Sequence, residues 1–352
     1  KTVKETVDLL KRLIATPSMS RDEGAVADVL QQEMLHRGLE VHREGNNLWS
    51  VSPDYNPEQP TLLLNAHIDT VPPNAAWQHD PFAPTLEGDR LYGLGSNDCG
   101  GGLVTLLEVF CQLTEHPQKY NLVYAASAEE EVSGKDGFSR MLPLLPHIDV
   151  ALVGEPTGMQ PATSERGLMV LDVTARGKAG HAARNEGVNA IYKAMDDMEW
   201  FRTFHFPRVS PSLGEVKMNV TIVSAGTKHN CIPDECRFTV DVRVNECYSN
   251  QEVLEIICEN VKSEVKARST RLSSSHIDEQ HPLIRAAVAM GLVPYGSPTL
   301  SDQALMPFPS FKLGPGESAR SHTADEYICI SELEQAFDTY MQLLDGRELK
   351  FE

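Results

Sequence analysis

The chain has 352 residues, a formal net charge of −19 at pH 7 and seven cysteines. This length exceeds what one hydrophobic core usually organises, so two domains are expected. The acidic charge argues against nucleic acid or an anionic membrane surface as a partner, and no apolar run is long enough to span a membrane.

The N-terminal residues and the cysteines bear on the cellular compartment. Residues 1–12 have the pattern of a charged amphipathic helix and not of a signal peptide. The chain begins with Lys1 and not with Met, so we expect a short preceding segment. The cysteines lack the paired spacing of a disulfide framework or of a CxxC zinc site, which favours free thiols in a reducing cytoplasm.

The first 160 residues alternate helical and extended patterns. Short apolar runs separated by helical periodicity are typical of an α/β fold, with a mostly parallel sheet and helices on both faces. The pattern predicts helices over residues 5–14, 21–36 and 103–113, and strands over residues 61–66, 121–126 and 150–153.

The middle of the chain has the order strand, helix, strand, strand, helix, strand, which is the split arrangement of a small ferredoxin-like domain. Polar, turn-rich segments flank it, so we expect an inserted α+β domain over residues 163–279, while residues 1–162 and 280–352 form the first domain. The predicted strands are 168–175, 217–223, 236–244 and 269–274, the helices are 189–204 and 251–265, and the later elements are helices 282–290 and 331–344 around a strand at 308–313.

Side chains that bind metals follow several of the apolar runs. His67 and Asp69 come after one strand, the acidic triplet Glu129–Glu131 after the next, and Glu155 after the third. Ligands gather at the carboxyl ends of parallel strands, so these side chains are expected to converge. Histidine and carboxylate ligands suit zinc or a similar divalent ion, which indicates a metal-dependent hydrolase.

Two further segments complete the candidate set. Asp98 lies in a glycine-rich loop that opens a helix, where it is suited either to cap that helix or to bridge two metals. The loop lacks the Lys-Ser/Thr ending of a phosphate-binding loop and the spacing of a dinucleotide fingerprint. With His322 near the C-terminus, two coordination shells can form, with one His for each metal and Asp98 shared.

The chemistry also suggests individual roles. His67 can bind a metal while Asp69 accepts its other ring N–H, which fixes the tautomer. Within the triplet, one Glu can be a ligand while its neighbour acts as general base on the attacking water. Cys99 follows Asp98 directly but has no adjacent His to activate it, so a bystander thiol is favoured over a nucleophile.

The ordered set of motifs resembles the co-catalytic dizinc deacylases and exopeptidases, the family of acetylornithine deacetylase, succinyl-diaminopimelate desuccinylase, aminoacylase and carboxypeptidase G. The resemblance covers essentially the whole chain. It implies a catalytic dizinc hydrolase domain and an inserted lid and dimerisation domain. The motifs are His67-x-Asp69, Asp98, the acidic triplet, Gly154-Glu155-Pro156-Thr157, and Gly314-Pro315-Gly316 followed by His322 and Asp325-Glu326.

The resemblance implies a ligand for each coordination position. One zinc would be bound by His67, Asp98 and Glu155, and the other by Asp98, Glu131 and His322. Co²⁺ or Mn²⁺ would substitute for Zn²⁺. The run from Glu130 to Gly134 fits the family pattern, so Glu130 is expected as the general base and Glu131 as a ligand, while the register with Glu129 and Glu130 stays open.

The resemblance also assigns residues outside the metal set. His181 matches a lid His that relatives offer to the partner subunit's active site, where it helps to stabilise the oxyanion. Asn230 and Arg243 match positions that bind the carboxylate end of the substrate, and Gly314 and Gly316 are placed with them as substrate-binding positions. One departure is Cys99-Gly100-Gly101, where relatives commonly have Met-Lys-Gly, which removes a positive charge beside the metals.

The expected function is hydrolysis of the amide bond of a small N-acyl amino acid by a cytoplasmic homodimer. The first candidate substrate is N-acetyl- or N-succinyl-ornithine or -citrulline in arginine synthesis, followed by succinyl-diaminopimelate and a dipeptide. A non-catalytic metal-binding relative and a thiol hydrolase that uses Cys99 are alternatives from other classes. A chelator distinguishes the thiol hydrolase from a dizinc enzyme, because the thiol hydrolase would keep its activity in the chelator and the dizinc enzyme would lose it.

Overall fold

The computed structural model describes residues 2–352, which form two compact units. Unit 1 contains the chain up to Thr163 together with His276–Tyr295 and Ser301–Glu352, and unit 2 contains Ser164–Ser275 and Gly296–Leu300. The sequence placed residues 296–300 in the first domain, whereas they cluster with unit 2, and it placed residues 163 and 276–279 in the inserted domain, whereas they cluster with unit 1. Lys1, the first residue of the predicted N-terminal helix, lies outside the described residues.

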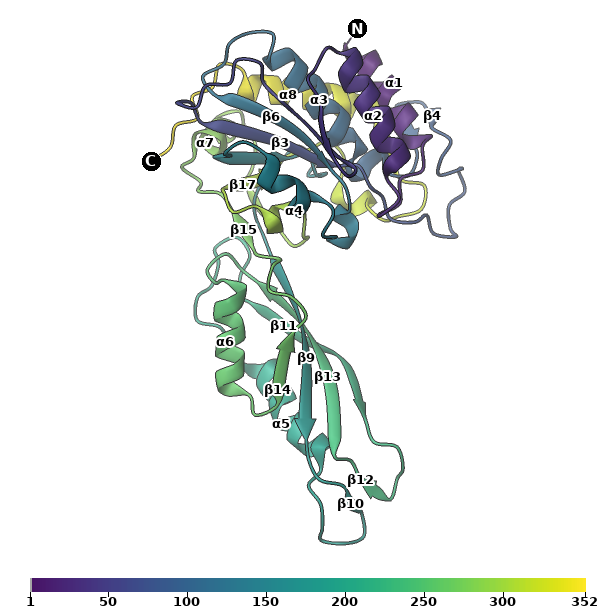
Figure 1. Ribbon diagram of the computed structural model, residues 1–352, viewed down its shortest axis with the longest axis vertical. Coiled ribbons are helices and arrows are strands. Elements are labelled where there is room, and N and C mark those ends of the chain that lie inside the picture. The colour runs from purple at the N-terminus through teal and green to yellow at the C-terminus, as the bar shows by residue number, and fades with distance from the viewer. Residues whose placement is uncertain (1) are drawn as a thin grey trace. The chain divides into compact units, whose positions relative to one another are not determined.

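The centre of unit 1 is a sheet whose middle strands are parallel, which confirms the predicted fold class (Figure 1). These parallel strands lie in the order β6 (Asn121–Ser127), β3 (Thr61–His67), β7 (Val150–Val153) and β17 (Ser310–Lys312). The sequence pattern did not predict the antiparallel strands β1 (His42–Glu44) and β2 (Asn47–Val51), nor the short strands β8 (Ala162–Glu165), β15 (Ser275–His276) and β16 (Tyr295–Ser297).

Alternation along β3 divides the packing of unit 1 between two faces. Leu62, Leu64 and Ala66 belong to the larger hydrophobic core, whereas Leu63 belongs to a smaller core on the other face. Figure 1 shows helices on both faces of the sheet. The larger core contains residues of α1 (Thr2–Ile14), α2 (Gly24–His36), α3 (Gly101–Leu113), α7 (Pro282–Ala289) and α8 (Ile330–Leu344), and the smaller core those of α4 (Phe138–Met141).

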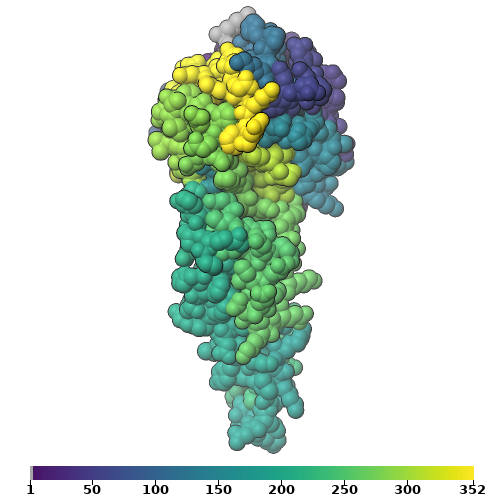
Figure 2. Space-filling view, turned by 90° about the vertical axis from the view of Figure 1, so that its left-hand side faces the viewer, coloured from purple at the N-terminus to yellow at the C-terminus, as the bar shows by residue number. Residues whose placement is uncertain are grey.

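Local sequence patterns account for the helices that pack on the larger core. In α1, Val7, Leu10 and Ile14 are buried at the i, i+3, i+7 spacing of one helical face. α7 begins with Pro282 in its first turn, where the missing N–H costs no hydrogen bond. α7 and α8 pack together, and Figure 2 shows the yellow C-terminal residues beside the green residues of α7.

Short elements connect the larger ones and carry several candidate site residues. A three-stranded antiparallel sheet contains β18 (Tyr327–Cys329), β5 (Arg90–Tyr92) and β4 (Thr85–Glu87). The single-turn helices are η1 (Ser96–Gly100), η2 (Glu130–Val132), η3 (Leu142–Leu144), η4 (Asp302–Leu305) and η5 (Ser318–Arg320). No helix among the described residues combines the length and the apolar character needed to cross a membrane.

Unit 2 has the predicted ferredoxin-like order of elements. Its four-stranded sheet is antiparallel, and along β9 the buried side chains alternate with partly exposed ones, as expected for a sheet with one covered face. In chain order the elements are β9 (Gly167–Arg176), α5 (Ala190–Thr203), β11 (Lys217–Ala225), β13 (Glu235–Val244), α6 (Asn250–Asn260) and β14 (Glu264–Ala267), and a separate hairpin contains β10 (Gly180–His181) and β12 (Cys231–Ile232).

The last strand of unit 2 differs from the prediction. The sequence predicted a helix that continues to residue 265 and a strand at residues 269–274, but α6 ends at Asn260 and β14 occupies Glu264–Ala267. Buried Asp197 of α5 accepts hydrogen bonds from the backbone N–H groups of Lys262 and Ser263. This long-range contact fixes a turn that local periodicity could not reveal.

A close approach in unit 1 gives a test of the packing that positions Glu155. A Cβ added to Gly102 of α3 would lie 1.8 Å from the backbone oxygen of Gly154, at the end of β7. We predict that Gly102→Ala lowers the free energy of unfolding by about 1–3 kcal/mol, because α3 must move away from the strand. Denaturant unfolding would measure the change. Gly24→Ala, whose Cβ would meet its nearest atom at 3.8 Å, is the matched control and should change stability far less.

Candidate metal centre

Three neighbouring parallel strands deliver side chains to the same edge of the sheet in unit 1. β3 ends at His67, which is paired in register with Ser127 of β6, while Asn65 is paired with Val153 of β7. The chain beyond β6 reaches the acidic triplet, and the chain beyond β7 reaches Glu155. The parallel arrangement therefore brings together residues that are up to 88 positions apart in sequence.

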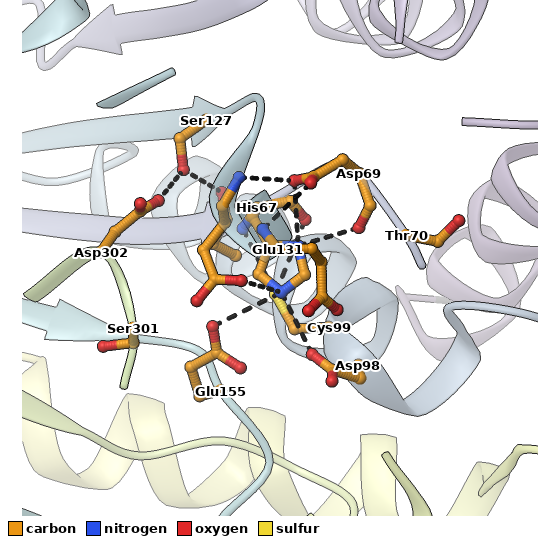
Figure 3. Close-up of polar contacts among 12 residues, drawn as sticks. His67, Asp69, Thr70, Asp98, Cys99, Ser127, Glu131, Glu155, Ser301 and Asp302 are labelled. Carbon is orange, nitrogen blue, oxygen red and sulfur yellow. Dashed lines mark hydrogen bonds and ion pairs between the residues drawn. The ribbon is translucent and has the colours of Figure 1, made fainter. Parts of the chain in front are cut away.

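The two candidate ligand histidines face carboxylates on both sides of Asp98 (Figure 3 shows the His67 side). The Nε2 atom of His67 lies 3.1 Å from Asp98 Oδ1 and 3.4 Å from Glu155 Oε1. The Nε2 atom of His322 lies 2.9 Å from Glu131 Oε2 and 3.4 Å from Asp98 Oδ2. Each oxygen of Asp98 thus faces a different imidazole, which is the arrangement required of a carboxylate that bridges two ions.

The three residues of the acidic triplet point in different directions. Glu130 Oε2 lies 3.7 Å from His67 Nε2, and the Glu131 carboxylate faces His322. The Glu129 carboxylate instead accepts a hydrogen bond from the backbone N–H of Asp136, 3.2 Å away in its own loop. This geometry favours the register in which Glu130 and Glu131 are the functional pair.

Buried carboxylates hold the turns that carry these residues. Asp69 accepts hydrogen bonds from the backbone N–H groups of Glu130 at 3.0 Å and Glu131 at 3.1 Å. The nearest acceptor for the His67 Nδ1 atom is the backbone oxygen of Asp69 at 2.9 Å, whereas the expected acceptor, its carboxylate, lies 3.4 Å away. Around Asp98, the backbone N–H groups of Gly95, Asn97 and Asp98 all donate to the Glu326 carboxylate.

The electrostatics of the centre fit divalent cations. Burial, followed by the neighbouring carboxylate charges, raises the pKa of Glu131 to about 9 and that of Glu155 to about 8, and raises the pKa of Glu130 well above its ordinary value. Burial alone would lower the pKa of His67, but charges that include those of Glu130 and Glu155 raise it well above the usual range. Crowded carboxylates of this kind require a cationic partner to ionise together.

One orphaned atom points to the same conclusion. The Oε1 atom of Glu131 is buried and has no hydrogen-bond partner among the described residues. A buried carboxylate oxygen without a donor is costly unless a cation satisfies it. Together with the imidazole and carboxylate donors around it, this oxygen fits a metal ligand.

Cys99 does not have the environment of a nucleophile. Its thiol is buried and accepts a hydrogen bond from the His67 backbone N–H at 3.2 Å. Burial raises the pKa of the thiol well above its ordinary value, so the thiol stays protonated at neutral pH. A reactive cysteine needs the opposite shift, and this finding disfavours the thiol hydrolase.

The predicted residues of unit 2 lie in two places. His181 and Asn230 are close together, because the backbone N–H of Ala182 donates to the Asn230 oxygen at 3.0 Å beside the β10–β12 pair. His181 is exposed. Arg243 is near the C-terminal end of β13, where its guanidinium donates to both carboxylate oxygens of Asp241.

The two predicted glycines of unit 1 support the metal centre through close backbone approaches. A Cβ at Gly314 would lie 2.3 Å from the backbone oxygen of Glu155. Gly316 has a φ of +86°, and a Cβ there would lie 2.2 Å from the Asn97 side chain. Both positions therefore require glycine because they pack against segments that carry candidate ligands.

Sequence reasoning missed several polar residues that contact this centre. Asp302 is buried, and its carboxylate accepts a hydrogen bond at 2.6 Å from the Oγ atom of Ser127, the last residue of β6 (Figure 3). Ser20 Oγ donates to Asp69 Oδ2 at 2.7 Å, and Glu23 accepts from the backbone N–H of Glu129. No motif marks these residues: Ser20 and Asp302 lie in segments between predicted elements, and Glu23 lies at the start of the helix predicted over residues 21–36.

Comparison with known proteins places the chain in a family. Residues 63–346 match the family described as peptidase family M20/M25/M40. The chain belongs to this family. As a member of the M20/M25/M40 peptidases, it is a metal-dependent hydrolase that acts on amide bonds.

Individual relatives are similar over nearly the whole chain. Acetylornithine deacetylase of Yersinia pseudotuberculosis is 27% identical over 96% of each chain, and succinyl-diaminopimelate desuccinylase of Rhizorhabdus wittichii is 27% identical over 97% of each. A solved dinuclear metal-binding peptidase of the M20 family from Bacillus subtilis has the same fold, with a TM-score of 0.72 and 16% identity over 97% of each chain.

The raised pKa values predict that metal binding releases protons. A pH of 7 is below the metal-free pKa values of Glu131 and Glu155, which are about 9 and 8, so both carboxyl groups are protonated at this pH. A metal binds the ionised forms, so binding must release these protons. Metal affinity should therefore increase as the pH rises from 6 to 9, and the released protons should decrease in number over the same range. Calorimetric titration of the metal-free protein with Zn²⁺, in two buffers of different ionisation enthalpy, measures the protons. A binding enthalpy at pH 7 that does not depend on the buffer would contradict the prediction.

Proposed function

We propose that this chain is a cytoplasmic dizinc deacylase that hydrolyses the amide bond of an N-acyl amino acid. The first candidate substrate is N-acetyl- or N-succinyl-ornithine or -citrulline, which would make arginine synthesis the pathway. The observation that carries the proposal is the placement of Asp98 between His67 and His322, with Glu130 beside the first imidazole. The relatives named as deacetylase and desuccinylase support the substrate class.

The proposed ligands follow from this arrangement. His67, Asp98 and Glu155 would hold one ion, and Asp98, Glu131 and His322 the other. The dinuclear relative supports two ions, and zinc is proposed because imidazole and carboxylate donors suit it, with Co²⁺ or Mn²⁺ as substitutes. When bound, the two ions would polarise the amide carbonyl and acidify a water molecule.

The chain itself would move the protons and hold the substrate. Glu130 would take a proton from the attacking water and return it to the leaving amine. Burial raises the pKa of Glu130 when no cation is bound, so bound ions would be needed to keep this carboxylate ionised as the base. Asp69 would keep His67 and the Glu130 turn oriented, while Asn230, Arg243, Gly314 and Gly316 would form the contacts to the substrate.

A homodimer would complete the site through unit 2. We propose that His181 of the partner subunit helps to stabilise the oxyanion, as the resemblance to related deacylases implies. β11 supports a dimer because it lies at the edge of the sheet in unit 2, where Ile222 and Val223 are 59% and 54% exposed. An exposed edge strand with apolar side chains is a ready surface for pairing with a second chain.

Alternative substrates and classes lead to different outcomes in one experiment. Succinyl-diaminopimelate is favoured by the desuccinylase relative, and a dipeptide by the peptidase that shares the fold. A non-catalytic metal-binding relative would bind ions without turnover. The complete ligand set and the intact Glu130 argue against that class.

A substrate panel should separate these possibilities. We expect the purified protein with added Zn²⁺ to hydrolyse N-acetyl- or N-succinyl-ornithine or -citrulline faster than succinyl-diaminopimelate or dipeptides, and to lose all activity with a chelator. Glu130→Gln should lower kcat by roughly 10²–10⁴-fold because it removes the general base. Metal analysis should still find two ions in this variant, since Glu130 is not a proposed ligand.

The control for the panel is Glu129→Gln, which changes the neighbouring acid whose side chain points into its own loop. It should lose far less activity than Glu130→Gln. Full turnover in Glu130→Gln, or activity that resists the chelator, would refute the proposed mechanism. In the other register Glu129 is the base and Glu130 a ligand, so a large loss of kcat in Glu129→Gln together with loss of a bound ion in Glu130→Gln would support that register.

The role of His181 across subunits can be tested by mixing inactive variants. We expect His181→Ala to lower kcat by roughly 10²-fold through loss of an oxyanion contact. A mixture of His181→Ala and Glu130→Gln chains, unfolded and refolded together, should regain activity, because a mixed dimer contains one intact site. If the mixture stays as inactive as either variant, His181 does not act across the dimer.

A further inference from the structure

In the turn that carries Glu130 and Glu131, the backbone N–H groups of residues 128–131 all donate to side chains from elsewhere in unit 1. Such consecutive acceptors leave the turn little freedom. Three side chains from different segments supply them. Asn47 Oδ1 accepts from the N–H of Ala128 at 2.9 Å, Glu23 Oε1 from that of Glu129 at 3.0 Å, Asp69 Oδ1 from that of Glu130 at 3.0 Å, and Asp69 Oδ2 from that of Glu131 at 3.1 Å.

The backbone of this turn needs such support. Glu129 has a φ of +55° and Ser133 a φ of +47°, so a residue with a side chain occupies the left-handed region at each end of η2. Non-glycine residues in that region cost free energy and persist where the surroundings fix them. The hydrogen bonds from the backbone N–H groups of residues 128–131 hold the turn in this conformation.

Two of the supporting residues come from the short segment between α1 and α2. Ser20 Oγ donates to Asp69 Oδ2 at 2.7 Å, and the backbone N–H of Ser20 donates to the Thr70 oxygen at 3.1 Å. Glu23 is 1% exposed, and its Oε1 also accepts from the backbone N–H of Arg21 at 2.8 Å. The segment is thus fastened both to the end of β3 and to the turn after β6.

We infer that Ser20 and Glu23 are positioning residues for the proposed general base. Glu23 acts through the Glu129 amide, and Ser20 acts through Asp69, which holds the amides of Glu130 and Glu131. The inference rests on the proposed function, because it assumes that the aim of the Glu130 carboxylate limits turnover. Neither side chain has a hydrogen bond to a candidate ligand side chain or to a proposed substrate-binding position, so we expect their loss to lower kcat and to change KM little.

The principal experiment compares two substitutions of Glu23. Glu23→Ala removes the acceptor, and we expect kcat to fall roughly 10–100-fold, as for other residues that orient a metal or catalytic group, while KM changes less than twofold. Glu23→Gln keeps an oxygen that can accept from the Glu129 N–H, so it should retain most of kcat. Ser20→Ala and Ser20→Thr form a second pair with the same expectation, which covers the case in which Glu23→Ala fails to fold.

The matched control is Glu33→Gln in α2. Glu33 is an acid with hydrogen bonds like Glu23, although its side chain is 15% exposed; its partners are Arg12 and Arg37, and it has no ion pair with a residue of the metal centre. This variant should lower Tm through a lost ion pair while kcat stays unchanged. It therefore reports what a purely structural loss of a buried acid does to this protein.

Hydrogen exchange gives a readout that does not depend on activity. In Glu23→Ala and Ser20→Ala, the amides of residues 128–134 should exchange faster than in the unsubstituted protein, with little change in the helices of unit 1. The inference is overturned if kcat stays within twofold in both alanine variants, if Gln and Thr fail to restore it, or if exchange in this turn is unchanged. Full turnover of Glu130→Gln would instead overturn the proposed function.

Discussion

Repulsion among buried carboxylates is the constraint on which this structure depends. The carboxylates of Asp98, Glu130, Glu131 and Glu155 each lie within 4 Å of the imidazole of His67 or His322, and their side chains are at most 12% exposed. Such a group is unfavourable in an empty protein, and the raised pKa values of three of these acids express the cost. The fold therefore has to hold these carboxylates close together in the absence of bound cations. The parallel strands and the hydrogen-bonded turns that follow them do so.

A second set of acids does not add to this repulsion in the same way. Burial acts to raise the pKa of Asp69, but its interaction with His67, followed by the hydrogen bonds from Ser20 and the Glu131 amide, keeps this pKa below the ordinary value. Glu326 receives three amides, but burial raises its pKa to about 7. These carboxylates face backbone N–H groups and not the candidate ions. Carboxylates that face imidazoles are thus the candidate metal ligands, whereas carboxylates that face backbone N–H groups stabilise the turns that carry those candidates.

The part of this organisation that follows from sequence is the part encoded locally. Alternation in β3 and the polar residue at its end place His67 at the sheet edge, and the same reasoning holds for Glu155 after β7. The contributions of Ser20, Glu23 and Asp302 depend on contacts across 49, 106 and 175 positions, which periodicity does not report. The wrong prediction for β14 has the same origin. Asp197 of α5 binds the backbone N–H groups of Lys262 and Ser263, just beyond the end of α6, and this contact is not visible in the local pattern.

The departure from the family pattern at Gly100 becomes intelligible in these terms. A Cβ there would lie 2.5 Å from the Gly95 oxygen and 2.8 Å from a methyl group of Leu10, so the backbone as folded here leaves no room for the Lys that relatives commonly carry. Gly95 has a φ of +79° and gives its N–H to Glu326, which also holds Asp98. The missing lysine is therefore coupled to the packing of the Asp98 loop against α1. In this chain, the charge of buried Lys312 in β17 partly opposes the rise that burial causes in the pKa of Glu155, so Lys312 supplies a cation near this carboxylate.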